Sequence, residues 1–300
     1  MSNIATAKPL PEKMRLSENI RLKRAFQRGI LYLLTFILVI IFGFPLYWMI
    51  NVSLMTQFEA FAFPPLLYPR SWQWQNYVEM FTRVPLAQWF YNTIVIAIFQ
   101  VAGSTASSMV VGYAFGRFRF PGRDALFMIT LGTMMFPSQI TLIPQFVLFH
   151  RLGWINTFNP LIVPAFFGGG AFNIFLMRQF IMQLPRDLDE AALIDGAGYL
   201  RIFFSILAPL LKPVVATVAI IRFMGSWNDF MGPLIYLQSN RLFTLAVGLR
   251  FWDTQPVLGE VSLTHLMMAM CMIMTMPCVI LFFLAQRVFV RGIVMSGIKG

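Results

Sequence analysis

The chain has 300 residues, of which 58% are hydrophobic and 12% are charged, and its formal net charge at pH 7 is +11. About 25% of the residues of a soluble domain are charged, so this composition excludes an ordinary soluble protein and places most of the chain in lipid. The Lys and Arg residues are scattered between apolar blocks, whereas a nucleic-acid-binding protein gathers them on one polar surface. The composition and its apolar blocks therefore predict an all-α integral membrane protein.

Six apolar blocks follow a polar N-terminal tail, residues 1–28, for which the sequence indicates no function and no signal-peptide cleavage site. A helix needs about 20 residues, at about 1.5 Å of rise each, to cross about 30 Å of hydrocarbon. Each block can hold one crossing, although the fifth contains Lys212, Arg222 and Asp229. We therefore predict a membrane domain over residues 29–290, a C-terminal tail over residues 291–300, and spans in residues 29–55, 84–116, 125–149, 152–177, 202–237 and 266–286.

Helix-breaking residues interrupt the third and fourth of these spans. The third contains Pro137 and Pro144, and the fourth contains three consecutive glycines at residues 168–170. Such breaks are stable in a membrane only where protein or a water-filled cavity satisfies the freed backbone groups. We expect neither span to be a uniform rod, and both ordinary kinks and a role in a transport pathway fit the pattern.

The segments between the spans carry Lys and Arg unequally. If the segments alternate between the two sides of the membrane, sixteen of these residues lie on the side of the N-terminal tail and five on the other. Cytoplasmic segments are enriched in Lys and Arg, so the sequence predicts that both termini are cytoplasmic.

The most polar stretch after the tail lies between the fourth and fifth spans, at residues 184–200. Pro185 suits the start of a helix, and the acidic residues that follow suit the positive end of the helix dipole. Gly196 or Gly198 can end the helix, because glycine adopts the left-handed conformation common at helix C-termini. The pattern therefore predicts a cytoplasmic surface helix of about three turns.

One face of this predicted helix is rich in small residues, while Asp189 and Glu190 point elsewhere. The face is formed by residues at helical spacing: Leu188, Ala191, Ala192 and Asp195. Small residues let another surface approach closely, which favours docking of a partner. Any short surface helix between two spans can show the same pattern, so the spacing alone leaves both interpretations open.

The same loop resembles a known motif. A Glu-Ala-Ala sequence at residues 190–192 is followed, after three intervening residues, by Gly196 and, after a further gap of nine residues, by Ile206 and then Pro209. This spacing resembles the EAA loop of the permease subunits of binding-protein-dependent ABC importers, although Ala208 stands where that family usually has leucine. The sequence Trp-Asn-Asp-Phe at residues 227–230 and the C-terminus resemble the maltose-type carbohydrate permeases of this family, and the resemblance extends over nearly the whole chain from the first span onward.

The resemblance implies a type I ABC importer permease with six transmembrane helices, which forms half of the translocation pathway of an ATP-driven sugar importer in the bacterial inner membrane. Its partners would be an ABC ATPase dimer, a second, homologous permease in a heterodimer, and an extracytoplasmic solute-binding protein. The loop helix would seat in a cleft of the ATPase and pass on its movement. The residues implied in this coupling are Asp189, Glu190, Ala191, Ala192, Asp195 and Gly196.

The chain lacks the Gly-x-x-x-x-Gly-Lys-Ser/Thr loop that binds nucleotide phosphates, so ATP and Mg would be bound by the partner ATPase. His150 and His265 lie in different segments without an evident acidic partner, and no metal-ligand cluster stands out. We therefore expect a transport subunit that is not an enzyme and binds no cofactor or metal itself.

Polar residues near the end of the fifth span are candidates for the substrate pathway. Arg222 and Asp229 are seven residues apart, so both can lie on one side of a helix, where we expect them to pair. Trp227, Asn228 and Asp229 offer a stacking face, an amide and a carboxylate, which are groups that hold sugar hydroxyls. Bracing of the helix packing is the alternative role for these residues.

The outer segment, residues 238–264, mixes aromatic and polar groups, and the sequence alone predicts an exposed loop there. The resemblance implies that it meets the solute-binding protein. The candidate docking residues near its middle are Arg250, Phe251, Trp252, Asp253 and Gln255.

Other transport functions remain open. An autonomous secondary transporter would need repeated halves or several carboxylates within the membrane, whereas only Asp229 is present. An ABC permease for another solute, such as a phosphate ester or an amino acid, fits the sequence as well, because a few side chains and the external binding protein set the cargo. The sequence also leaves homodimeric pairing of the permease open.

Overall fold

All regular secondary structure that the computed structural model describes, over residues 12–254 and 263–297, is helical, as the sequence predicts. The longest helices are α1 (Glu12–Ser53), α4 (Leu86–Arg117) and α15 (Thr264–Gly297). The others are α2 (Gln57–Ala60), α3 (Gln75–Arg83), α5 (Arg123–Gly132), η1 (Thr133–Met135), α6 (Ser138–Arg151), α7 (Asn159–Ile162), η2 (Val163–Phe166), α8 (Ala171–Gln183), α9 (Asp187–Ile194), α10 (Tyr199–Ile202), η3 (Phe203–Leu207), α11 (Ala208–Leu210), α12 (Lys212–Trp227), α13 (Met231–Tyr236), η4 (Asn240–Leu242) and α14 (Leu245–Thr254).

Within the described residues, four stretches are long and apolar enough to cross a membrane: Phe26–Ser53, Leu86–Arg117, Asn159–Gln183 and Thr264–Gln286. Two helix pairs meet the same test only jointly: Arg123–Met135 with Gln139–Arg151, bent by 102°, and Tyr199–Leu210 with Lys212–Trp227, bent by 76°. The described chain thus has up to six spans if each bent pair is one span, and these correspond to the six predicted blocks.

Breaks are present in both the third and the fourth span, although Pro144 lies inside α6 and ends no helix. Pro137 separates η1 from α6, because proline lacks the N–H that would continue the preceding turn. Gly168, Gly169 and Gly170 separate η2 from α8 and have φ values of 94°, 69° and 93°. Glycine adopts this conformation without a steric penalty, so three consecutive glycines produce a non-helical step within the span.

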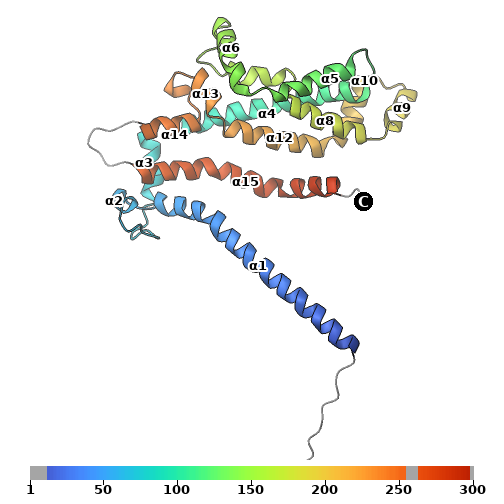
Figure 1. Cartoon of the computed structure of the whole chain (residues 1–300). Coiled ribbons are helices and arrows are strands. Elements are labelled where there is room, and N and C mark those ends of the chain that lie inside the picture. Colours follow the sequence, from blue (N-terminus) through green and yellow to red (C-terminus); the bar gives the residue numbers. More distant parts are fainter. Residues whose placement is uncertain (1–11, 255–262, 298–300) are drawn as a thin grey trace, which may run out of the picture.

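The centre of the bundle is formed by α4, α8 and α12 (Figure 1). Two glycines of α4, four residues apart, let α8 approach closely. A Cβ atom on Gly112 would lie 2.6 Å from the Cβ of Met177, and one on Gly116 would lie 2.9 Å from the Cγ2 of Ile181. Small residues at this spacing allow transmembrane helices to pack in direct backbone contact.

Buried side chains gather in two clusters, one at each end of α4. The cluster at the end where α13 and α14 lie contains Trp89, Trp227 and Leu245. The cluster at the end where α9 and α10 lie contains Tyr113 and Ala192. We call these the α14 end and the α9 end of the bundle.

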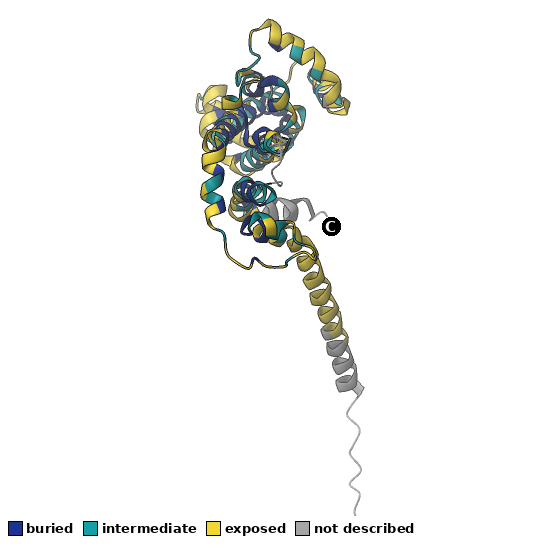
Figure 2. Ribbon diagram, turned by 90° about the vertical axis from the view of Figure 1, so that its left-hand side faces the viewer, coloured by how far each residue is buried: buried dark blue, intermediate teal, exposed yellow. Residues whose placement is uncertain are grey.

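Helix α1 projects away from the bundle and begins at Glu12, inside the predicted polar tail (Figure 1). Its residues 26–47 are exposed, whereas residues 51–55 are buried (Figure 2). Asn76 of α3 donates hydrogen bonds of 2.9 Å to the carbonyl oxygens of Ser53 and Met55. So long an apolar surface requires lipid or another protein chain to cover it.

Substitution of Gly112 tests the close contact between α4 and α8. Gly112→Ala is expected to lower the free energy of unfolding by about 1–3 kcal/mol, because the added methyl group overlaps Met177 and forces the helices apart. Gly132→Ala in α5 is the matched control, since no atom lies within 4 Å of a Cβ built there. Thermal unfolding of the full-length chain in detergent measures both, and equal melting temperatures would contradict the close contact.

Candidate functional site

The polar loop between the fourth and fifth spans contains the predicted short surface helix, α9. The helix has 8 residues, about two turns instead of the predicted three, and three acidic residues lie in its first turn. Gly196, with a φ of 79°, follows its C-cap. The Gly196 N–H donates to the Leu193 carbonyl and the Ala197 N–H donates to the Ala192 carbonyl, which is the Schellman arrangement that ends a helix.

The predicted small-residue face of α9 is divided between two environments. Ala192 is buried and packs within the hydrophobic cluster at the α9 end, whereas the other three members of that face are exposed. Asp189 and Glu190 point in different directions, because Asp189 turns toward the bundle and Glu190 is exposed. Asp189 and Ala192 therefore attach α9 to its own chain.

Arg117, the last residue of α4, ties the start of this loop to the bundle. Its Nε lies 2.7 Å from Oδ2 of Asp189, and its side chain is only 6% exposed. Nη1 and Nη2 each donate to the Leu184 carbonyl oxygen at 3.1 Å, and Nη2 also donates to that of Pro185 at 3.3 Å. The planar guanidinium thus contacts three residues of the loop at once, which fixes the loop's position relative to α4.

The electrostatics of this contact are set by burial as well as by charge. Burial raises the pKa of the Asp189 carboxyl above its ordinary value, and the positive charges of Arg117 and Arg186 oppose that rise. The second carboxylate oxygen, Oδ1, is enclosed without a hydrogen-bond partner among the described residues. The ion pair therefore contributes less to stability than its short distance suggests, because the carboxylate is incompletely satisfied.

The same helix, α4, also holds the end of the loop. The hydroxyl of Tyr113 donates to the carbonyl oxygen of Tyr199 at 3.4 Å. The ring of Phe118, directly after α4, meets the Tyr199 ring edge-on, with the ring centroids 5.2 Å apart. Tyr113 also packs on Phe203, at a centroid distance of 4.9 Å. Both ends of the loop are therefore attached to the same end of α4.

The outward side of the loop presents large apolar side chains. Ile194 is 86% exposed and Leu200 is 75% exposed, and Leu193 and Tyr199 are exposed beside them. Leu193 and Ile194 lie in the polar loop between two candidate spans, and Tyr199 and Leu200 begin the next candidate span beside that loop. Exposed apolar side chains that adjoin charged residues are typical of a protein contact surface.

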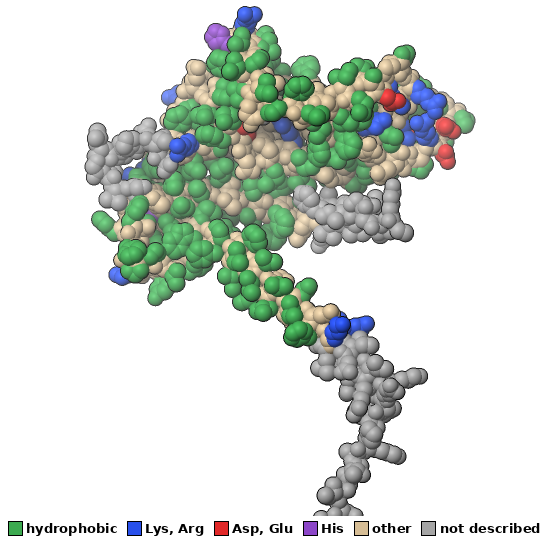
Figure 3. Space-filling model, viewed as in Figure 1, with side chains coloured by type: hydrophobic (Ala, Val, Ile, Leu, Met, Phe, Trp, Pro, Cys, Tyr) green, Lys and Arg blue, Asp and Glu red, His purple; other side chains and the backbone are tan. Residues whose placement is uncertain are grey.

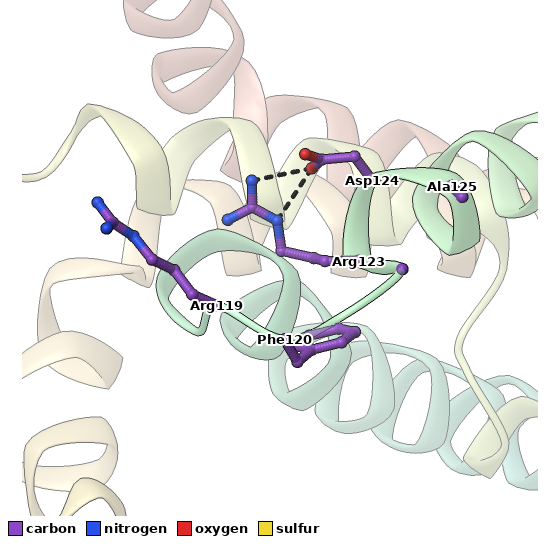
Figure 4. Close-up of a pocket in the computed structure, with 6 residues that line it drawn as sticks. Arg119, Phe120, Arg123, Asp124 and Ala125 are labelled. Carbon is purple, nitrogen blue, oxygen red and sulfur yellow. Dashed lines mark hydrogen bonds and ion pairs between the residues drawn. The ribbon is translucent and has the colours of Figure 1, made fainter.

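A cavity of about 320 Å³ opens at the turn from α4 into α5 (Figure 4). It is lined by Arg119, Phe120, Gly122, Arg123, Asp124 and Ala125. Two nitrogens of Arg123, Nε and Nη2, each lie 2.9 Å from Oδ1 of Asp124, so the charge of Arg123 is matched within the cavity. Figure 3 shows further basic and acidic side chains at this end of the molecule, which makes it the most charged part of the described surface in that view.

The predicted stacking role of Trp227 is contradicted by its position. Trp227 is 1% exposed, and its Nε1 donates to the carbonyl oxygen of Met274 at 2.9 Å. Its ring stacks on Phe223 and meets Phe90 edge-on. A sugar can stack only on an accessible ring face, so Trp227 instead braces α12 against α4 and α15.

Arg222 and Asp229 do not form the predicted ion pair. Among the described residues, no nitrogen of Arg222 lies within 4.0 Å of the Asp229 carboxylate. Oδ1 of Asp229 accepts instead from the Gly232 N–H at 3.1 Å. The Nδ2 of Asn228, an exposed residue, donates to the Met224 carbonyl of its own helix. Arg222, Asn228 and Asp229 are thus at least partly exposed polar residues near the end of α12.

Residues 245–254 of the outer segment form a helix, α14, where the sequence predicts a loop. Arg250 and Phe251 are exposed on it, and the Phe251 ring stacks on Phe243 with centroids 4.9 Å apart. Trp252 is half-buried against the cluster at the α14 end. The side chain of Asp253 and the whole of Gln255 lie outside the described residues.

Sequence reasoning missed Arg117, the residue that positions the candidate site. The sequence indicates only that Arg117 is one of many basic residues on the predicted cytoplasmic side. Its contacts with Leu184 and Asp189 join parts of the chain that are far apart in sequence, so no local pattern reveals them. No group of three or more His, Cys, Asp or Glu residues suited to a metal ion occurs in the part of the chain that the structure describes.

Two substitutions separate the charge of the Arg117–Asp189 contact from its geometry. Arg117→Ala is expected to lower the free energy of unfolding by about 2–4 kcal/mol, because it leaves a partly buried carboxylate and a loop carbonyl without partners. Asp189→Asn is expected to cost less, since burial already disfavours the ionised form. Thermal unfolding of the full-length variants in detergent gives the comparison, and a larger loss for Asp189→Asn would contradict it.

Two bacterial permeases are similar to the chain over most of its length. The arabinooligosaccharides transport system permease protein AraQ of Halalkalibacterium halodurans is 37% identical over 226 residues, which cover 75% of this chain and 79% of that protein. The galactooligosaccharides transport system permease protein GanQ of Bacillus subtilis is 33% identical over 285 residues, which cover 94% of this chain and 99% of that protein.

A solved structure and a family model complete the comparison. A bacterial ABC transporter that imports the acidic polysaccharide alginate has a chain of the same fold, with a TM-score of 0.77 at 21% identity, covering 94% of this chain and 99% of that chain. The model of the family described as binding-protein-dependent transport system inner membrane component matches residues 108–295. The chain therefore belongs to this family and is a membrane-spanning subunit of a transport system.

Proposed function

We propose that the chain forms half of the translocation pathway of an ATP-driven importer of oligosaccharides in the bacterial cytoplasmic membrane. The observation that carries this proposal is the loop of residues 184–200, whose outer side is exposed and apolar while Arg117 and Tyr113 hold its inner side to α4. A loop that is open to a partner and fixed to a span suits the transfer of movement from that partner. The loop and both termini would be cytoplasmic.

The partner at this loop would be a dimer of ABC ATPases, which would bind ATP and Mg. The exposed residues Glu190, Ala191 and Asp195 would contact the ATPase together with Ile194. Asp189 and Ala192 would act from the other side of α9, by holding the helix rigidly on the bundle. Gly196 would supply the sharp end of the helix.

Oligosaccharides are the favoured class of cargo. The two similar permeases described above are named for arabinooligosaccharides and galactooligosaccharides. Arg222, Asn228 and Asp229 would supply donors and acceptors for sugar hydroxyls near the end of α12, without the stacking contribution of Trp227.

Two further partners complete the proposed importer. A second, homologous permease in a heterodimer would cover part of the apolar surface that α1 and the bundle expose. An extracytoplasmic solute-binding protein would meet the α14 end, where Arg250 and Phe251 are exposed. Asp253 and Gln255 remain candidates for the same contact.

Co-purification tests the ATPase contact. The tagged chain, expressed with its neighbouring genes, is expected to recover an ATPase subunit from detergent extracts. Ile194→Glu and Glu190→Lys are expected to lose it, because one places a charge in an apolar contact and the other reverses a charge. Phe63→Glu is the control, since Phe63 is 94% exposed in the loop after α2.

If Ile194→Glu and Glu190→Lys both retained the ATPase, that result would contradict the proposal that α9 is the docking helix. Recovery of the native chain alone, together with solute uptake into vesicles without ATP, would replace the importer with an autonomous transporter.

Uptake into proteoliposomes tests the cargo. The assembled importer with its solute-binding protein is expected to take up a neutral oligosaccharide, such as an arabinotriose, in preference to an amino acid or glycerol phosphate. Asn228→Ala is expected to lower this uptake about tenfold, which corresponds to the loss of roughly one hydrogen bond. Equal uptake by the native chain and the variant would show that Asn228 does not contact the cargo.

A further inference from the structure

The α14 end of α4 is attached to the outer segment, as its other end is attached to the loop of residues 184–200. The Nε1 of Trp89 donates to the Asn240 carbonyl oxygen at 2.9 Å. The Trp89 ring lies against Gly248 of α14, so closely that a Cβ atom on Gly248 would come within 2.2 Å of it. The indole therefore fixes both η4 and α14 to α4.

Asn92 and Thr93, one turn further along α4, complete this contact. Nδ2 of Asn92 donates to the carbonyl oxygens of Arg241 and Phe243 at 2.8 and 3.0 Å, and Asn92 is 1% exposed. Oγ1 of Thr93 accepts from the Leu245 N–H at 2.8 Å. We call Trp89, Asn92 and Thr93 the outer grip. They bind backbone atoms of residues 240–245, the segment that contains η4 and leads into α14.

Between its two ends α4 is one continuous helix. It has 32 residues, or about 48 Å of helix, and contains no proline. Gly112 and Gly116 allow α4 to pack closely against α8 near one end. In its middle, Gln100 and Ser107 donate to carbonyl oxygens of the fourth span, at Leu161 and Ala165. A continuous helix held to its neighbours along its length can pass a displacement from one end to the other.

We propose that α4 mechanically joins the cytoplasmic loop to the outer segment, and that the outer grip is the positioning element through which the solute-binding protein influences ATP hydrolysis. This inference rests on the proposed function, because it assigns the two ends of α4 to the ATPase and to the solute-binding protein. Coupling between two sites is reciprocal, so a change at either end shifts the equilibrium at the other. The residues of the outer grip act through backbone atoms of residues 240–245 and need not touch either partner.

The test uses the complete importer in lipid nanodiscs, with ATP hydrolysis measured with and without the cargo-loaded solute-binding protein. Asn92→Leu keeps the approximate size of the side chain and removes both hydrogen bonds to the outer segment. We expect it to lower the stimulation by the solute-binding protein about fivefold or more, while hydrolysis without that protein stays within about twofold of the native rate. Thr93→Val, a smaller change, is expected to act in the same direction.

Asn76→Leu is the matched control. Asn76 is also a buried asparagine that donates to two carbonyl oxygens, but it lies on α3 and binds the end of α1. It is expected to keep the native ratio of stimulated to unstimulated hydrolysis. Recovery of each assembled complex, and its melting temperature, separates loss of folding from loss of coupling.

The outcomes are distinct. Native stimulation in both Asn92→Leu and Thr93→Val would overturn the inference, and so would an equal loss in Asn76→Leu, because that result would indicate general loosening of the fold. An importer whose native form assembles with no ATPase, or responds to no solute-binding protein, would instead overturn the proposed function, on which the inference depends. A loss of stimulation in Asn92→Leu and Thr93→Val, but not in Asn76→Leu, supports the inference.

Discussion

The close approach of α4 to α8 is the contact on which the rest of the site depends. Because Gly112 and Gly116 carry no side chains, the two helices meet at van der Waals distance over their final turns. Helix α8 then leads straight into the loop of residues 184–200, beside the last residue of α4. Arg117 can reach both Leu184 and Asp189 only because the two helix ends lie together. A larger residue at position 112 would move the loop as well as the helix.

Local patterns in the sequence were sufficient to predict most of the fold. Hydropathy over about 20 residues identifies a span, and the glycines at residues 168–170 and Pro137 identify the breaks, because both signals depend on near neighbours alone. The end of α9 at Gly196 is likewise a matter of local backbone conformation. Helix α14 was predicted as a loop, since its mixture of aromatic and polar residues hides a helix that packs on Trp89.

The candidate site was predicted only in part, because residue type does not say which way a side chain faces. Trp227 has the chemistry of a sugar-stacking residue, yet Phe90 and Phe223 enclose it. Asp189 and Glu190 are adjacent acidic residues, but only Asp189 has a buried arginine opposite it. These distinctions come from contacts between segments distant in sequence. The short acidic motif consequently binds its own chain through Asp189 and leaves Glu190 exposed.

Helix α1 is attached to the rest of the chain near one end only, and its other end extends away from the bundle. Its only buried stretch among the described side chains, residues 51–53, lies at the end next to α3, and Asn76 binds that end through hydrogen bonds. From there to Phe26 the helix extends about 40 Å. A rotation of about 10° at the attached end would move Phe26 by roughly 7 Å. A small force on the distant end therefore produces a large torque at the attached end. The direction of α1 therefore depends on the lipid or protein that covers its exposed apolar surface.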